Sequence, residues 1–141
     1  MKELDVKQEN ERKKEYLDGY RKCVRQLDRL NEELSEIRIN KMFSSLIQDG
    51  MPHAHTTTDL SGYAARIDKI GRKIVKARYQ KINKLKNIRD RIERMSDENE
   101  KDVLFYRYIK GMKWEEIAVK MMYTYRNVTK IHGRALKNFQ I

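Results

Sequence analysis

A repeating pattern of apolar side chains in the N-terminal third constrains the fold of this 141-residue chain more than any other feature. The apolar residues alternate between steps of four and three, which is a heptad pattern. Such a pattern is typical of a long helix that packs one stripe against a partner helix. We therefore predict a helix over about residues 2–48. The stripe consists of Tyr16, Tyr20, Cys23, Leu27, Leu30, Leu34 and Ile37.

A loop is predicted over residues 49–62, which contain the single proline, Pro52, with two glycines and consecutive threonines. These residue types disfavour a helix. A second helix is expected over about residues 63–95, with Asp59 or Ser61 as its N-cap. Its apolar stripe slips in phase near residues 77–81, which shifts the buried seam without ending the helix. The stripe consists of Tyr63, Ile67, Ile70 and Ile74, followed by Ile82, Leu85, Ile88, Ile92 and Met95.

Residues 1–95 therefore form the first predicted domain, a long antiparallel helical hairpin. A helix of this length cannot bury its stripe alone and needs a partner. The heptads are equally compatible with pairing between subunits, which would give a homodimer. We favour pairing within the chain, with dimerisation through the apolar surface that remains.

Residues 96–141 form the second predicted domain, in which three short helices make a C-terminal helix-turn-helix. The first helix is expected over about residues 98–109. Asp97 and Glu100 have the spacing of a capping box at its start, and Gly111 follows its end. Its inward residues are Val103, Leu104 and Tyr108.

The second helix of this domain is predicted over residues 114–121 and the third after a turn at residues 122–124. Thr124 is a good N-cap for the third helix. The predicted core residues of both helices are Trp114, Ile117, Ala118, Met121, Val128, Ile131, Ala135 and Leu136. The expected fold class is therefore all-α.

The outer face of the third helix predicts binding to double-stranded DNA. The chain has a net charge of +11, to which residues 1–62 contribute −1, residues 63–97 contribute +8 and residues 98–141 contribute +4. Such an excess favours an anionic partner. In a recognition helix the N-terminal residues reach base edges and later cations meet phosphates. The predicted DNA-binding residues are Thr124, Tyr125, Arg126, Asn127, Thr129, Lys130, Arg134 and Lys137.

Within this set, Arg126 can pair with guanine and Asn127 with adenine, whereas Lys130, Arg134 and Lys137 neutralise phosphates. The alternative is a three-helix bundle with a cationic face that only meets solvent. The basic residues 66–94 either extend the DNA footprint or form a solvated face opposite the acidic residues 28–36.

Two segments resemble region four of bacterial sigma factors, namely residues 107–118 (RYIKGMKWEEIA) and 131–136 (IHGRAL). They are closer still to phage-encoded sigma-like regulators of the RinA and ArpU late-operon type. Residues 52–63 (PHAHTTTDLSGY) are similar to the linker of such proteins. The resemblance implies sequence-specific DNA binding in transcription control, with contact to host RNA polymerase as a further option.

Two positions depart from the pattern of this family. Met122 stands in the turn, where glycine is usual, and a left-handed backbone there costs a non-glycine residue about 1 kcal/mol or more. Lys113 stands before Trp114, where serine or threonine is frequent, and its side chain cannot accept an amide hydrogen bond.

No residue pattern predicts an enzyme, a cofactor or a metal site. His53 and His55 lack the fuller ligand set that zinc sites show. His132 is expected to make a polar or phosphate contact. The single Cys23 fits a reducing cytoplasm. The sequence shows neither a signal peptide nor an apolar segment long enough to span a bilayer. We therefore expect a cytoplasmic protein without membrane contact.

Two other functions remain open from the sequence. A phage DNA-packaging protein resembling a terminase small subunit also joins a helix-turn-helix to helical assembly elements. A coiled-coil adaptor that binds RNA polymerase or another protein would use the long helices instead.

Overall fold

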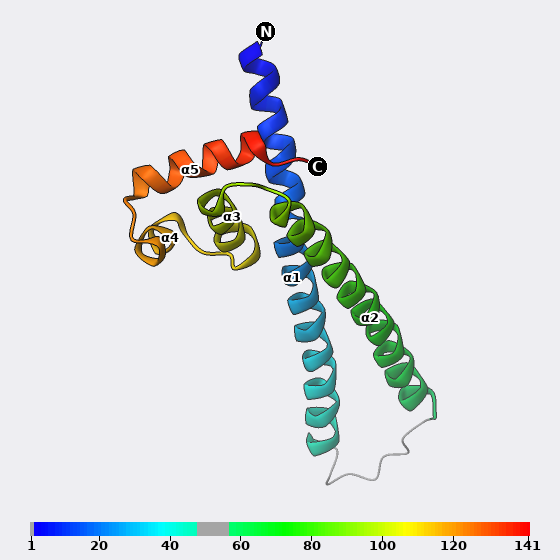
Figure 1. The fold of residues 1–141 in the computed structure, drawn as a ribbon. Helices are drawn as coiled ribbons and strands as arrows, with labels where there is room; N and C mark the ends of the chain where they lie inside the picture. The colour runs from blue at the N-terminus through cyan, green and yellow to red at the C-terminus, as the bar shows by residue number, and fades with distance from the viewer. Residues whose placement is uncertain (1, 48–56) are drawn as a thin grey trace. The chain divides into compact units, whose positions relative to one another are not determined.

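The structure is a computed structural model that describes residues 2–47 and 57–141, and all its elements there are helices (Figure 1). The expected all-α class is confirmed. The elements are α1 (Lys2–Ile47), α2 (Thr57–Glu93), α3 (Glu98–Leu104), the π-helical turn η1 (Phe105–Ile109), α4 (Trp114–Met121) and α5 (Tyr125–Asn138). None of the helices in these two stretches is both long and apolar enough to cross a membrane.

The chain divides into two compact units. Residues 24–80 form one, which we call the middle unit, and residues 1–23 with 81–141 form the other, the terminal unit. The three short C-terminal helices therefore share their unit with the first turns of α1 and the last turns of α2. The division at residues 95 and 96 that the sequence suggested stays a prediction.

In the middle unit, α1 packs on α2 along the heptad seam, and the two helices run in opposite directions (Figure 1). The Lys41 ammonium also lies 5.5 Å from the centre of the Tyr63 ring. Packing of the long N-terminal helix on the second is therefore confirmed. The seam consists of Leu27, Ile70, Ile74 and Ala77, with Leu30, Leu34 and Ile37 partly buried against them.

The second helix begins at Thr57, six residues before the predicted start at Tyr63. The predicted loop was therefore wrong for residues 57–62, and its other residues, 49–56, lie outside the described chain. Threonine and glycine weaken a helix by less than about 1 kcal/mol each, whereas each added residue extends the hydrogen-bonded ladder of an existing helix. Within residues 57–62 there is no proline to stop that extension.

The apolar stripe of α2 shifts in phase where the sequence predicts it, but one residue that the sequence assigned to the stripe is exposed. Ile82 is 61% exposed, and the buried side continues through Ala77, Lys81 and Leu85 instead. Two successive steps of four place these residues on the inner side and turn Ile82 outward. On α1 the heptads missed Leu17, which is fully buried beside the predicted Tyr16.

The terminal unit contains two apolar clusters. The first joins α1, α2, α3, η1 and α5, and the second lies between α3, α4 and α5. The first consists of Leu17, Ile88, Ile92, Met95, Leu104, Tyr108, Ile109, Ala135, Leu136 and Phe139. The second consists of Val103, Ile117, Ala118, Val128 and Ile131, with Trp114 and Met121 partly buried against it.

The helix predicted over residues 98–109 is not uniformly α-helical. It widens into a π-helical turn in which the Lys110 amide donates to the Phe105 carbonyl at 3.0 Å. The wider turn lets two consecutive side chains, Tyr108 and Ile109, both enter the first cluster. Gly111 then ends the element as expected, with φ +69°.

Candidate nucleic-acid interface

Helix α5 separates its residues into a buried side and a cationic side. The buried side contains His132 in addition to the apolar residues that the sequence predicted. Because the exposed residues recur about every four positions, they follow one another along the opposite side of the helix. The buried residues are Val128, Ile131, His132, Ala135 and Leu136, and the exposed cations are Arg126, Lys130, Arg134 and Lys137.

The start of α5 is fixed by its cap and by the turn before it. Thr124 is the N-cap, and its Oγ1 accepts a hydrogen bond from the Asn127 amide at 3.1 Å, as expected. Met122, which ends α4, has φ 60° and ψ 39°, the left-handed conformation that favours glycine. At the start of α4, Lys113 is an N-cap without a side-chain hydrogen bond. Lys113 and Met122, the two positions that differ from the sigma-like pattern, are therefore the residues that flank α4.

Seven of the eight predicted DNA-binding residues are exposed. The exception is Thr129, which is half-buried and donates its hydroxyl hydrogen to the Arg126 carbonyl at 2.9 Å. The turn and first turn of α5 bring together Thr124, Tyr125, Arg126 and Asn127, whereas Lys130, Arg134 and Lys137 follow along the helix.

The cations of α5 have no acidic partner in the described residues. The helix itself contains neither aspartate nor glutamate. The ion pairs observed within residues 2–47 and 57–141 join side chains one turn apart in α1, α2 and α3. Like charges at a spacing of four, such as Arg126 and Lys130, weaken an isolated helix by about 0.2–0.5 kcal/mol per pair. An anionic partner on this side would relieve that repulsion.

A buried aromatic cluster supports α5 from behind. The Tyr108 hydroxyl and His132 Nε2 lie 2.7 Å apart, within hydrogen-bond distance. The Trp114 ring meets the His132 ring edge-on at 4.5 Å, and the Arg107 guanidinium lies 4.3 Å from the centre of the Trp114 ring. These contacts fix the side of α5 that does not face solvent.

Burial sets the protonation of this cluster. It lowers the pKa of His132 to about 4, helped by the charges of Lys14 and Arg107. It also raises the pKa of Tyr108. His132 is therefore neutral near pH 7 and makes a buried polar contact. Of its two expected roles, the polar contact is confirmed, and the phosphate contact stays a prediction for a residue that is only 8% exposed.

Two residues for which the sequence predicted no contact with α5 tie this helix to the rest of the terminal unit. The buried Lys13 donates from Nζ to the Leu136 carbonyl at 2.8 Å and to the Lys137 carbonyl at 3.3 Å. These carbonyls belong to the last turn of the helix, where intrahelical partners are missing. No sequence signal distinguishes Lys13 from its neighbours Arg12 and Lys14, because the contact is made across 123 residues of chain.

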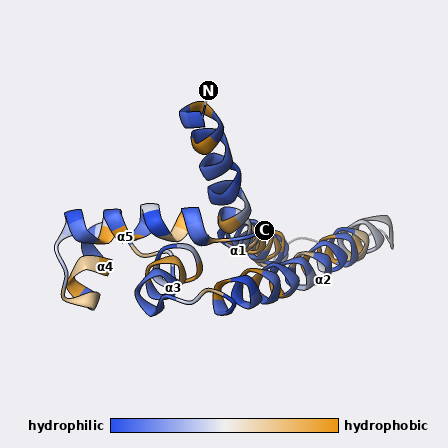
Figure 2. Ribbon diagram, turned by 45° about the horizontal axis from the view of Figure 1, so that its top comes forward, coloured by the Kyte–Doolittle hydropathy of each residue, from blue (hydrophilic) through white to orange (hydrophobic). Residues whose placement is uncertain are grey.

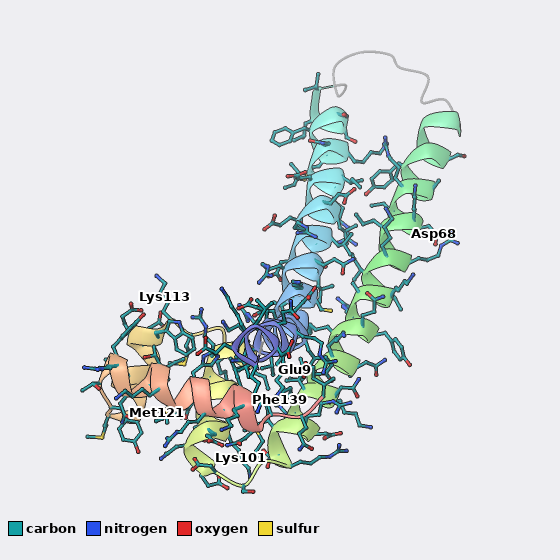
Figure 3. The ribbon with its side chains drawn as sticks, turned by 90° about the horizontal axis from the view of Figure 1, so that it is seen from above. Glu9, Asp68, Lys101, Lys113, Met121 and Phe139 are labelled. Carbon is teal, nitrogen blue, oxygen red and sulfur yellow. The ribbon has the colours of Figure 1, made fainter. Side chains whose placement is uncertain are left out.

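The buried Glu100 makes the second tie. Both carboxylate oxygens accept from Asn138 Nδ2, at 2.9 and 3.1 Å. The predicted capping box is therefore half formed: the Asp97 side chain accepts from the Glu100 amide at 3.0 Å, whereas the Glu100 carboxylate binds α5. Figure 3 shows this part of the chain with its side chains, Lys101 of α3 and Phe139 after α5 among them.

No group of three or more histidine, cysteine, aspartate or glutamate side chains in the described stretches is placed to hold a metal ion. His53 and His55 lie outside those stretches. The candidate interface of α5 presents four exposed cations and the side-chain amide of Asn127.

A comparison of the chain with protein-family models, with curated proteins and with solved structures finds no match. The resemblance to sigma-factor region four therefore stays a prediction.

Proposed function

We propose that this protein is a sequence-specific DNA-binding regulator of transcription, of the phage or prophage type. In this proposal α4, the turn and α5 act as a helix-turn-helix, and α5 enters the major groove of double-stranded DNA. The observation that carries the proposal is the exposed side of α5, which presents four cations without a nearby acidic residue in the helix. In Figure 2 the ribbon of α5 alternates between hydrophilic and apolar residues, in agreement with a helix that has one buried side and one polar side.

The proposed contacts divide into two kinds. Arg126 and Asn127, in the first turn of α5, reach base edges, and each bidentate pair contributes about 1–3 kcal/mol of discrimination. Lys130, Arg134 and Lys137 lie further along and meet phosphates, which holds the protein on any sequence. Thr124 and Tyr125 lie at the rim, where a hydroxyl can reach a phosphate.

Selection of bound sequences from a random duplex pool, followed by titration at several salt concentrations, tests the proposal. Replacing Arg126 or Asn127 by alanine should reduce the preference for the selected sequence. Lys130→Ala should weaken binding to all sequences and lower the slope of log K against log salt by about 1. Failure of the protein to bind any duplex at low ionic strength would contradict the proposal.

A matched control comes from α2. Lys86 is an exposed lysine of α2 outside the proposed surface. Under the proposal, Lys86→Ala leaves both affinity and salt slope unchanged. A loss as large as that of Lys130→Ala would instead assign the basic face of α2 to the DNA footprint.

The measured mass separates this function from DNA packaging, which the sequence left open. A monomer or a homodimer agrees with a regulator of transcription, and a large ring agrees with a packaging protein. Binding of RNA polymerase by the long helices alone would favour the adaptor.

A further inference from the structure

Gly133 lies in the interior of α5 and on its exposed side. Glycine loses more backbone freedom than alanine when a helix forms, so it is unfavourable in such a place. A glycine inside a helix can serve where another group must come close to the backbone. The question is therefore whether such a group lies within this chain.

The chain itself does not require glycine at this position. A Cβ atom added to Gly133 meets no atom within 4 Å. Gly111 shows the opposite case, because its φ is +69° and an added Cβ would lie 2.7 Å from Arg21 Cζ. Neither backbone strain nor packing thus explains Gly133, and the space above it is open to another molecule.

Cations surround this open patch of backbone. Lys130 precedes Gly133 by three residues, Lys137 follows it by four, and Arg134 is its neighbour. All three side chains are exposed, and α5 has no acidic residue. A surface of bare backbone between positive charges matches a chain of phosphates joined by sugars.

We propose that Gly133 is the point at which the sugar–phosphate backbone of bound DNA crosses α5 in direct contact with the helix. The inference rests on the proposed function and deepens it. A recognition helix reads bases near its N-terminus and meets the DNA backbone further along. The missing Cβ lets the strand approach closely and brings its phosphates within reach of Lys130 and Lys137.

Two substitutions at Gly133 and one control test the inference. Gly71 in α2 is the control, because an added Cβ there also meets nothing within 4 Å. Gly133→Ala and Gly71→Ala should each raise the melting temperature, by roughly 2–4 °C. Only Gly133→Ala should weaken binding to a labelled duplex of mixed sequence, by roughly tenfold. Gly133→Leu should weaken it further.

The form of the loss identifies the contact. Because no charge is removed, the salt slope of Gly133→Ala should equal that of the unchanged protein, in contrast to Lys130→Ala. The loss should also be similar on every sequence, since backbone contacts carry no sequence information.

Four outcomes overturn the inference. If the Gly133→Ala protein binds DNA as tightly as the unchanged protein, the DNA backbone does not contact Gly133 closely, and the proposed function is unaffected. A lower melting temperature would show that the fold itself needs the glycine. A loss confined to one DNA sequence would assign Gly133 to a base. An unchanged protein that binds no duplex would remove the proposed function and the inference together.

Discussion

The terminal and middle units each contain part of α1 and part of α2, but they are held together by different interactions. In the terminal unit, side-chain hydrogen bonds join different elements, such as Lys13 to the end of α5 and Glu100 to Asn138. In the middle unit, the side-chain hydrogen bonds of the described residues stay within one helix, as from Ser45 to the Lys41 carbonyl. There the two helices meet through an apolar seam and one cation–π contact.

The two kinds of interaction differ in how strictly they fix the positions of the helices within each unit. Displacing the partner of a buried polar group destabilises the folded protein. A network in which every polar group has a partner therefore favours one arrangement of the helices. An apolar heptad seam without such polar contacts defines its register and its partner helix less strictly. The unit that carries the proposed DNA surface is therefore the one whose side chains specify the position of α5.

The largest expected effect tests whether the units are energetically separate. Phe139 is fully buried in the first cluster, 6.1 Å from Tyr16 between ring centres. Phe139→Ala should lower the free energy of unfolding by about 3–5 kcal/mol. Urea denaturation followed by the fluorescence of Trp114, the single tryptophan, reports on the terminal unit.

The matched control lies in the seam of the middle unit. Ile74 is 5% exposed there. Ile74→Ala should lower the free energy of unfolding by about 2–5 kcal/mol, measured by urea denaturation followed by circular dichroism. Its effect on the Trp114 transition should be much smaller than that of Phe139→Ala. Equal shifts of the Trp114 transition in the two variants would show one cooperative unit and break the comparison.

The second effect depends on pH and belongs to the terminal unit. Burial lowers the pKa of His132 from 6.5 to about 4 in the folded protein. The unfolded chain therefore binds a proton that the folded chain excludes, so stability is complete above about pH 6.5 and is lost as the pH falls towards 4. The loss should reach about 3 kcal/mol, measured by urea denaturation at each pH.

A double variant isolates this contribution from the carboxylates that also titrate in acid. In His132→Leu with Tyr108→Phe, both polar partners become apolar, which can be nearly neutral for stability. The stability of this variant should depend less on pH between 6.5 and 4. Identical pH profiles of the two proteins would exclude His132 as the titrating group.

The third effect sharpens the comparison at the end of α5. Lys13→Met keeps the aliphatic stem but removes the ammonium that binds the Leu136 and Lys137 carbonyls. We expect a loss of about 1–3 kcal/mol, because hydrogen bonds to charged groups contribute more than neutral ones. Lys14→Met is the control, since Lys14 pairs with Glu11 on the exposed surface of α1 and such pairs contribute little. Equal losses would show that the buried position of Lys13 has no special role.

The sequence predicted what periodicity and local chemistry determine. The spacing of apolar residues predicted the seam of the middle unit, and the Thr124 cap and the bounds of α4 are as expected. The exposed side of α5 also follows from helical periodicity alone, because burying Val128 and Ile131 turns Arg126 and Lys130 outward.

What the sequence did not predict depends on contacts between distant segments. The partners of Lys13 and Glu100 lie on α5, and nothing in the neighbourhood of either residue indicates them. The π-helical turn lets Tyr108 and Ile109 both pack in the first cluster, and no repeat along the chain indicates such a turn. Ile82 was wrongly assigned to the buried stripe of α2. It lies next to the phase slip, where the spacing of apolar residues does not indicate which of them are buried.

The smallest expected effect concerns the turn before α5. Met122 is 90% exposed, so its side chain contributes no packing, and its left-handed backbone conformation is strained for a non-glycine residue. Met122→Gly should therefore stabilise the terminal unit by up to about 1 kcal/mol, less the entropy that glycine adds to the unfolded chain. Met122→Ala, which shortens the side chain and keeps the strain, should leave the Trp114 transition unchanged. If alanine stabilised the protein as much as glycine, the exposed methionine side chain and not the backbone conformation would be the unfavourable feature of this turn.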